Sequence, residues 1–203
     1  MIESEWRNAV EPHAMLEHLH TNGKPSDRKL RLFAVACSRR IWILIDNLGR
    51  AAVDAAEECA DGRLGSDELR AARLACQGTG GQASWYAAAT SPFIAARNAA
   101  RSAQAGAATL GTEAEELLAQ ADLVREIFDN PFQRYPDEQS WLTPCVVGLA
   151  QAIYDDRAFD RIPDLADALE RAGCENDKIL NHCRGPMPHV RGCWVIDLML
   201  GKE

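Results

Sequence analysis

The sequence lacks any apolar run close to the roughly 20 residues that a membrane-spanning helix requires. Its opening, MIESEWRNAVEPH, is polar and acidic, and it has neither the basic segment nor the apolar segment of a secretory signal peptide. We therefore expect a cytoplasmic protein that has no membrane partner.

Positive charge is also scarce. Lysine and arginine total 22 against 30 aspartate and glutamate residues, which gives a formal net charge of −8. A broad nucleic-acid interface needs a positive surface that displaces counterions from the phosphates. The charge balance therefore argues against a nucleic-acid partner, whereas the 47% of hydrophobic residues is ordinary for a soluble globular protein.

The cysteines do not form the pattern of a disulfide framework. Their number, seven, is odd, and no export signal accompanies them, so we interpret them as reduced thiols. Their spacing is irregular, at Cys37, Cys59, Cys76, Cys145, Cys174, Cys183 and Cys193. A chain of 203 residues buries about 70% of its unfolded surface, so its folding requires neither a disulfide nor a metal.

Strand pairs joined by hairpin turns are missing, and no unit of about 20–50 residues repeats along the chain. Helical periodicity and helix-boundary residues occupy nearly the whole sequence instead. We therefore predict an all-α fold, with residues 1–203 forming a single compact multi-helix domain. The longest loop, at residues 129–141, contains Pro131 and Pro136 and is the one place where the chain could be subdivided.

The most apolar helix is predicted at about residues 26–45, where Ser26 suits the N-cap position. Its main apolar face consists of Leu30, Phe33, Ala34, Cys37, Ile41, Leu44 and Ile45. Further apolar residues lie on the other side, among Arg28, Arg31 and Arg39. A helix that is apolar around most of its circumference is usually central, and we expect the arginine heads to extend to the surface.

Several other helix starts are indicated by residues suited to the first turn. They are Pro12, the Ser91-Pro92 pair and the Thr143-Pro144 pair. The segment WVIDLML, residues 194–200, fits a last helical turn or a strand.

The common catalytic and nucleotide-binding motifs are absent. The sequence has no Walker A loop, no G-x-G-x-x-G after a strand, no H-E-x-x-H and no G-x-S-x-G. No catalytic residue can therefore be assigned, and whether the protein is an enzyme stays open.

One short stretch does concentrate reactive residue types: HCRGPMPHVRGCW, residues 182–194. Cysteine and histidine are the usual zinc ligands, and a structural zinc site needs four ligands in a tetrahedron. The five candidate ligands are Cys174, His182, Cys183, His189 and Cys193. The spacing matches no standard zinc finger, and His182 and Cys183 diverge by about 100° on a helix, so only one of them is expected to bind a given ion.

Two other interpretations of this stretch remain open. The first is a rigid, hydrogen-bonded turn shaped by Gly185, Pro186 and Pro188, in which the cysteines are small buried hydrophobes. The second is a reactive thiol, for which Cys183, between His182 and Arg184 in the sequence, is the best candidate.

Three blocks of the sequence are distinctive: SDRKLRLFAVACSRRIW at 26–42, ADLVREIFDNPF at 121–132, and the tail that includes HCRGPMPHVRGCWVIDLMLGKE. Together they resemble a family of uncharacterised bacterial proteins. The resemblance extends to IESEW at residues 2–6 and omits the alanine-rich middle. The resemblance implies no activity. Members of such a family often have paired cysteines at the ACSRR position of the first block, whereas this chain has Cys37-Ser38 there.

The sequence thus favours a non-catalytic cytoplasmic interaction or regulatory module that binds a protein partner. The alternative is a zinc-binding or thiol-bearing protein that uses the Cys/His cluster at 174–193. No cofactor is expected apart from zinc in that alternative.

Overall fold

A computed structural model describes residues 1–203 except residues 24, 79–80, 134–139, 187 and 203. The predicted all-α class is confirmed: the structure is 72% helical, and the described residues contain no β-strand. The chain divides into two compact units, Met1–Arg125 and Glu126–Glu203. The boundary lies three residues before the 129–141 loop, of which residues 134–139 fall outside the described part.

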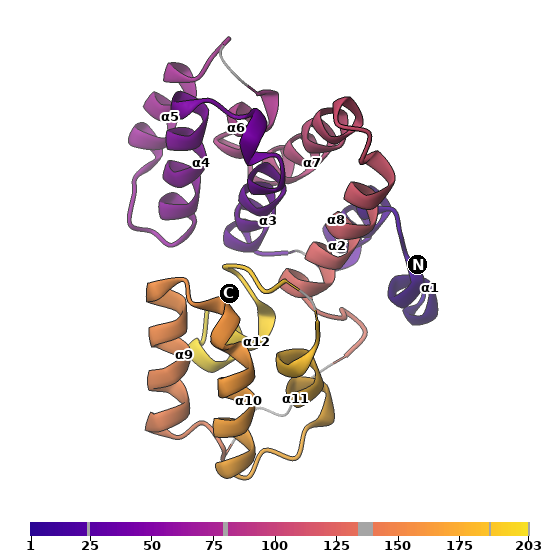
Figure 1. Cartoon of the computed structure of the whole chain (residues 1–203), viewed down its shortest axis with the longest axis vertical. Coiled ribbons are helices and arrows are strands. Elements are labelled where there is room, and N and C mark those ends of the chain that lie inside the picture. Colours follow the sequence, from indigo (N-terminus) through magenta and orange to yellow (C-terminus); the bar gives the residue numbers. More distant parts are fainter. Residues whose placement is uncertain (24, 79–80, 134–139, 187, 203) are drawn as a thin grey trace. The chain divides into compact units, whose positions relative to one another are not determined.

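The first unit contains the helices that precede residue 126 (Figure 1). They are α1 (Glu3–Asn8), α2 (Pro12–Asn22), α3 (Asp27–Arg40), the 3-10 turn η1 (Trp42–Leu44), α4 (Asn47–Ala60), α5 (Ser66–Ala75), α6 (Gln82–Ala87), α7 (Pro92–Thr109) and α8 (Glu113–Phe128), whose last turn continues into the second unit. The predicted helix starts at Pro12 and Pro92 are confirmed.

The second unit contains the remaining helices. They are α9 (Pro144–Asp156), the 3-10 turn η2 (Phe159–Arg161), α10 (Ile162–Arg171), α11 (Asp177–Arg184) and α12 (Trp194–Leu200). Thr143 caps α9 as expected, because its hydroxyl accepts a hydrogen bond from the Val146 N–H. The segment 194–200, for which helix and strand were both open, is helical.

Helix α3 is the central element of the first unit. It begins as predicted, since the Ser26 hydroxyl accepts a hydrogen bond from the Lys29 N–H. It packs against α4, α6 and α7, and Figure 1 shows it between α4 and α7. The facing side of α7 is built from small residues, which let the two helix backbones approach closely. The buried alanines of α7 are Ala95, Ala96, Ala99, Ala100, Ala103 and Ala107.

The central helix is shorter than predicted, because α3 ends at Arg40 and η1 follows it. Isoleucine occupies positions 41, 43 and 45 of the sequence, and β-branched side chains are less favourable in a helix than unbranched ones. The turn directs Ile41 and Leu44 toward Gly106 of α7, where an added Cβ would lie 3.2 Å from the Cδ1 atom of each. Glycine at 106 therefore makes room for the turn that replaces the last part of the predicted helix.

The prediction that the arginine side chains of this helix extend to the surface is wrong for Arg31, because its side chain is buried. Its guanidinium donates hydrogen bonds to the carbonyl oxygens of Ala87, Ala89 and Thr90, at 3.3, 2.8 and 3.4 Å. The last carbonyls of a helix lack intrahelical donors. Arg31 therefore ties α3 to the end of α6 and the turn that precedes α7.

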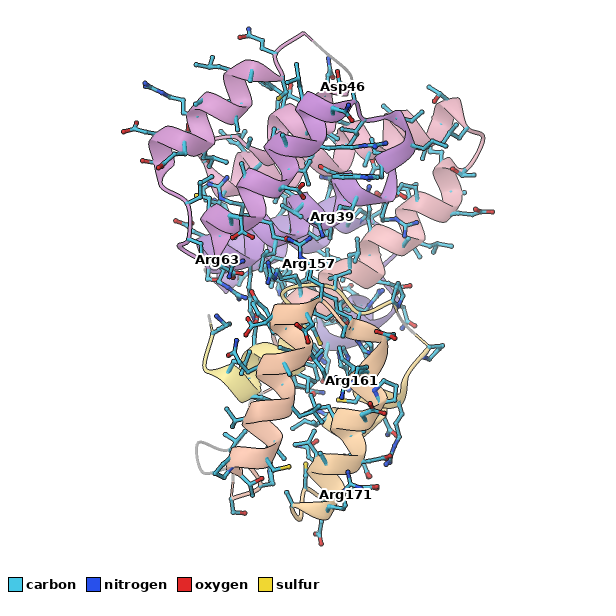
Figure 2. All side chains as sticks on the ribbon, turned by 60° about the vertical axis from the view of Figure 1, so that its left-hand side comes forward. Arg39, Asp46, Arg63, Arg157, Arg161 and Arg171 are labelled. Carbon is cyan, nitrogen blue, oxygen red and sulfur yellow. The ribbon has the colours of Figure 1, made fainter. Side chains whose placement is uncertain are left out.

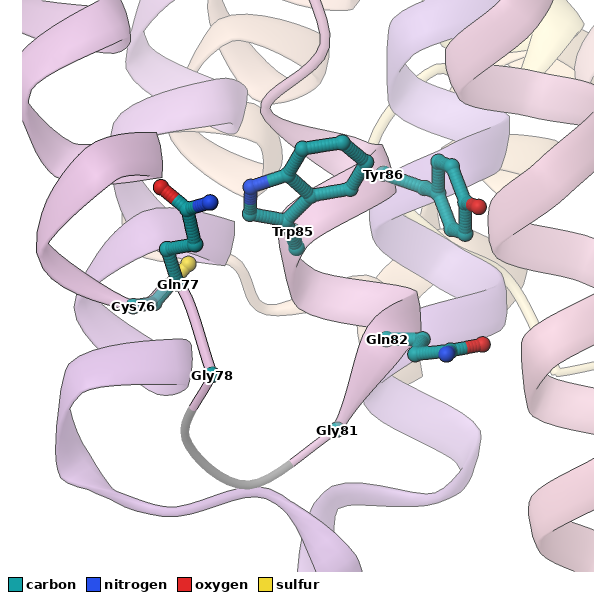
Figure 3. Close-up of a pocket in the computed structure, with 7 residues that line it drawn as sticks. All are labelled: Cys76, Gln77, Gly78, Gly81, Gln82, Trp85 and Tyr86. Carbon is teal, nitrogen blue, oxygen red and sulfur yellow. The ribbon is translucent and has the colours of Figure 1, made fainter.

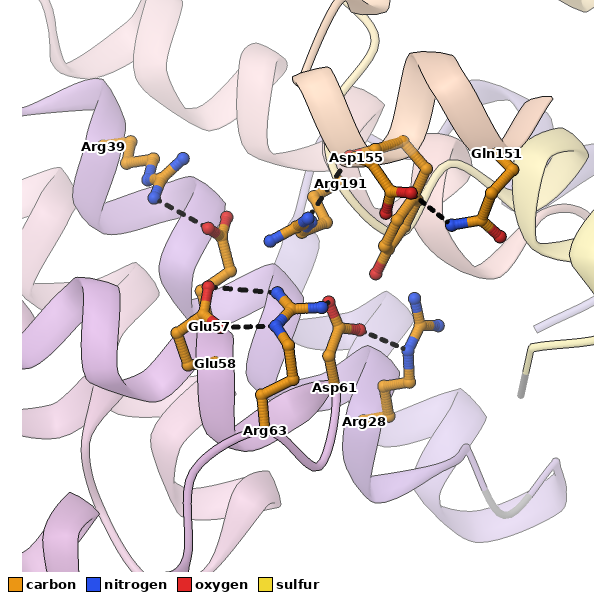
Figure 4. A network of polar contacts seen from close by, with 10 residues as sticks. Arg28, Arg39, Glu57, Glu58, Asp61, Arg63, Gln151, Asp155 and Arg191 are labelled. Atoms are coloured by element: carbon orange, nitrogen blue, oxygen red, sulfur yellow. Dashed lines mark hydrogen bonds and ion pairs between the residues drawn. The ribbon is translucent and has the colours of Figure 1, made fainter. Parts of the chain in front are cut away.

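The other arginines of α3 form ion pairs within the first unit (Figure 4). Arg28 contacts the buried Asp61 carboxylate at 3.1 Å, and Arg63 contacts the same carboxylate at 3.1 Å. Arg39 contacts the buried Glu57 carboxylate at 3.1 Å. Each of these carboxylates is thus compensated by a cation that is always charged.

The second unit has its own apolar core, in which α10 packs against α9 and α11, and α12 packs against α9. The core includes Ile153, Tyr154, Ile162, Leu165, Leu169, Ile179, Cys183, Cys193, Val195 and Ile196. The charged residues of α10 lie on its outer side, and Arg161 and Arg171 extend from its two ends (Figure 2). Among the described helices, none combines the length and the apolar character that a bilayer span would need.

Replacing Arg31 with methionine tests its role as an anchor. The substitution keeps an apolar stem but leaves three carbonyls without their donor, so we expect the free energy of unfolding to fall by about 2–4 kcal/mol. Urea denaturation followed by circular dichroism measures this change. The control is Arg70→Met on the exposed side of α5, which should change stability by less than about 0.5 kcal/mol. Equal midpoints for the two variants would contradict the anchoring role.

Candidate metal centre

Four residues with metal-binding side chains converge inside the second unit: Glu126, His182, His189 and Cys193. One ligand atom from each lies within 4.8 Å of all the others. Glu126 comes from the last turn of α8, His182 from α11, and the other two from the segment that joins α11 to α12. The cluster therefore depends on tertiary structure and not on one local motif.

The local sequence explains how the loop returns to the cluster. Asn176 caps α11, since its side-chain oxygen accepts from the Lys178 and Ile179 N–H groups. The helix ends at Gly185, before Pro186 and Pro188, which have no N–H for helix continuation. Gly192, with φ of 96°, then takes a left-handed turn that suits only glycine, and Cys193 follows as the N-cap of α12.

The distances inside the cluster are short. The Nδ1 atom of His189 lies 3.1 Å from Oε1 of Glu126, and Nε2 of His182 lies 3.2 Å from Oε2 of the same carboxylate. The same Nε2 atom lies 3.3 Å from Sγ of Cys193. The Glu126 side chain is 0% exposed, and the His189 and His182 side chains are 5% and 14% exposed. The four groups therefore interact in a largely water-free environment.

Hydrogen bonds stabilise the buried negative charge of Glu126. Burial disfavours its ionisation, but hydrogen bonds from His182 and His189 outweigh burial and lower the pKa of the carboxyl group below its ordinary value. The Val190 N–H also faces Oε1, at 3.4 Å. Among the described residues, no lysine or arginine pairs with this carboxylate. In this respect Glu126 differs from Glu57 and Asp61 of the first unit.

Without a bound cation, the environment of Cys193 favours the protonated thiol over the thiolate. Burial, and next the Glu126 charge, raise the pKa of Cys193 well above the ordinary value for a thiol. Backbone N–H groups of Ile196 and Val195 act in the opposite direction, because they hydrogen-bond to the sulfur. Two backbone N–H groups are thus in place to stabilise a thiolate, although burial outweighs them and keeps the sulfur protonated.

The second ring nitrogen of His182 has an unusual partner for a metal ligand. The indole Nε1–H of Trp194 donates to His182 Nδ1 at 3.0 Å. A neutral imidazole has one protonated and one unprotonated nitrogen. Since Nδ1 accepts, the proton resides on Nε2, where it is donated to Glu126 or Cys193. The hydrogen bonds thus define the tautomer of His182.

The structure brings together three of the five ligands predicted from sequence, His182, His189 and Cys193. Cys174 and Cys183 are free, buried cysteines outside the cluster. Of the adjacent pair, His182 belongs to the cluster and Cys183 does not. Glu126 was missed, because it lies 56 residues before His182 on another helix and no sequence spacing connects it to the tail.

The reactive-thiol interpretation is not supported at Cys183. Burial, together with the charge of Glu126, raises the pKa of this thiol to about 12. Arg184, its neighbour in the sequence, instead forms ion pairs with Glu170 and Asp167, at 2.6 and 3.0 Å. The charge of Arg184 lowers the pKa of Cys183 by less than burial raises it, so the thiol stays protonated at neutral pH and lacks the nucleophilic form.

A pocket of about 350 Å³ lies beside the cluster within the second unit. Its lining consists of Phe159, Asp160, Pro163, Gly185, Pro186, Pro188 and His189. His189 belongs both to this lining and to the cluster.

The first unit has a separate pocket of about 370 Å³, shown in Figure 3. It is lined by Cys76, Gln77, Gly78, Gly81, Gln82, Trp85 and Tyr86. The Arg73 guanidinium lies 3.7 Å from the ring centroid of Trp85, which is a cation–π contact. The lining combines amides and aromatic rings with one thiol whose pKa is raised by burial, so it lacks the acid–base or metal-binding set found in the second unit.

No protein-family model, curated protein or solved structure matches this chain. The resemblance to a bacterial family therefore stays a prediction.

Alkylation of the native protein tests the assignment of the thiols. Cys145 is exposed, whereas Cys183 is buried and has a pKa of about 12, so Cys183 should react with iodoacetamide at least about a hundredfold more slowly. Peptide mass spectrometry over a time course measures both rates. Labelling in denaturant, where all seven cysteines become accessible, is the control. Cys183 reacting as fast as Cys145 would restore the reactive-thiol interpretation.

Proposed function

We propose that residues 126–203 form a helical metal-binding module, with Glu126, His182, His189 and Cys193 as the ligands of a zinc ion. The observation that carries this proposal is the buried carboxylate of Glu126, which shares its site with a thiol and two imidazoles and, within the described residues, has no lysine or arginine partner.

Charge balance supports a divalent cation. A carboxylate and a thiolate bring two negative charges, which a doubly charged ion neutralises. Such an ion also favours the thiolate form of Cys193, which burial alone disfavours. Because burial disfavours charge, a zinc ion would add a counter-charge to the hydrogen bonds that already stabilise the Glu126 carboxylate.

Geometry supports a tetrahedral ion. Zinc–nitrogen, zinc–oxygen and zinc–sulfur bonds of about 2.0–2.3 Å place neighbouring ligand atoms about 3.3–3.6 Å apart in a tetrahedron. Three of the distances between cluster atoms are 3.1, 3.2 and 3.3 Å, and one ligand atom from each of the four residues lies within 4.8 Å of all the others. These distances are close to the tetrahedral values.

The type of ligand points to zinc and to a non-catalytic role. Nitrogen, sulfur and carboxylate oxygen are the ligands zinc prefers, whereas magnesium and calcium favour oxygen alone. Four protein ligands close the coordination shell, as in structural sites, while catalytic sites keep one position open. We accordingly place the protein among interaction or regulatory modules that bind a protein partner. The seven free thiols are consistent with the reducing cytoplasm.

Metal analysis of the purified, untagged protein tests the proposal. We expect about one zinc per chain by plasma mass spectrometry, and a lower melting temperature after chelation with the helical circular dichroism signal retained below the transition. Retention is expected because the metal-free cluster is already hydrogen-bonded. Absence of zinc after reconstitution with a stoichiometric excess would overturn the proposal.

Matched cysteine variants separate ligands from buried neighbours. Cys193→Ala and His189→Ala should each lower zinc affinity by at least about a hundredfold, because each removes a ligand. Cys174→Ala and Cys183→Ala remove buried cysteines of the same unit that lie outside the cluster, so they should retain stoichiometric zinc. Equal losses in both groups would indicate general destabilisation and not coordination.

A further inference from the structure

The hydrogen bond between Trp194 and His182 has a consequence for metal binding at the proposed site. His182 faces Glu126 and Cys193 through Nε2, so Nε2 is its ligand atom. A zinc-bound nitrogen carries no proton, and the proton of the neutral ring then resides on the other nitrogen. In the structure that other nitrogen, Nδ1, already faces the indole N–H of Trp194 at 3.0 Å.

Two N–H groups cannot hydrogen-bond to each other. Histidines that bind metal usually donate their second N–H to a carboxylate, a carbonyl or water. Here the second nitrogen is met by a donor, because an indole nitrogen has no acceptor capacity. The structure therefore fits the metal-free tautomer of His182, and the metal-bound tautomer requires the indole to move.

We propose that zinc binding and the Trp194–His182 hydrogen bond are mutually exclusive, so that Trp194 makes the site a metal-responsive switch. This inference rests on the proposed zinc site. In the metal-free state Trp194 donates to His182. In the zinc-bound state the imidazole proton moves from Nε2 to Nδ1, the indole leaves its position, and a carbonyl oxygen or water replaces it as the partner of Nδ1.

Trp194 is well placed to transmit this change. It is the first residue of α12, directly after the ligand Cys193, and it belongs to the apolar core of the second unit. Its ring lies 5.0 Å from the His182 ring, measured between centroids, at an interplanar angle of 58°. Since α12 packs against α9, displacement of the indole alters the start of the C-terminal helix and its contact with α9. Zinc binding thereby changes the conformation at the start of α12, and a partner protein could recognise this change.

Nuclear magnetic resonance of the full-length, ¹⁵N-labelled protein tests the switch. Long-range ¹H–¹⁵N correlation spectra identify which imidazole nitrogen carries the proton. We expect the Nε2–H tautomer for His182 in metal-free protein and the Nδ1–H tautomer after addition of one equivalent of ZnCl₂. The indole N–H resonance of Trp194 should shift and exchange faster with solvent in the zinc form, while that of Trp141, on the same core, stays in place.

Trp194→Phe provides a second, thermodynamic test. Phenylalanine cannot donate to His182, so zinc no longer has to break a hydrogen bond, and we expect zinc affinity to rise about three- to tenfold. Competition with a fluorescent chelator measures the affinity. Trp141→Phe is the matched control in the same unit and should leave the affinity unchanged.

The outcomes separate the two proposals. If wild-type protein binds no zinc, the zinc site itself fails. If it binds one zinc while His182 keeps its Nε2–H tautomer and the Trp194 resonance stays in place, the site stands and the switch is wrong. A zinc affinity that falls in Trp194→Phe but not in Trp141→Phe would also overturn the switch, since the indole would then support the metal-bound form.

Discussion

The buried carboxylate of Glu126 is the constraint on which the candidate site depends. A charge in an apolar core costs several kcal/mol unless other groups compensate it. In the first unit arginines fulfil this role, as Arg39 does for Glu57. In the second unit two imidazoles and a backbone N–H surround the carboxylate instead. The position of the loop between α11 and α12 follows from this requirement, because His189 has to reach the end of α8.

Helix starts were predictable because their signals are local. Ser26 and Thr143 act as caps through hydrogen bonds to residues three positions later, and proline at the first helical position needs no long-range partner. Arg31 was not predictable in the same way. Its acceptors lie 56–59 residues further along the chain, and nothing near Arg31 in sequence distinguishes it from the solvent-exposed arginines of the protein.

The site shows the same division between local and distant information. The tail placed His182, His189 and Cys193 within twelve residues, so the stretch was recognisable as a candidate from residue types alone. Choosing between His182 and Cys183 required the orientation of α11, and finding Glu126 required its contacts with His182 and His189 within the second unit. A carboxylate ligand is hard to find from sequence in a chain with 30 acidic residues, most of which serve as a solvated surface.

The partner of the second His182 nitrogen distinguishes a permanent metal site from a conditional one. A site that always holds zinc gains from an acceptor at that nitrogen, since the acceptor raises ligand basicity and fixes the metal-binding tautomer. Trp194 is a donor, so it stabilises the tautomer of His182 in which Nε2 carries the proton and cannot bind zinc. The metal-free cluster is consequently hydrogen-bonded through both His182 nitrogens, and the core around it includes Leu165 and Ile179, which need no ion in order to pack. Zinc would then change the conformation of an already folded unit, unlike the ion of a zinc finger, which brings about folding itself.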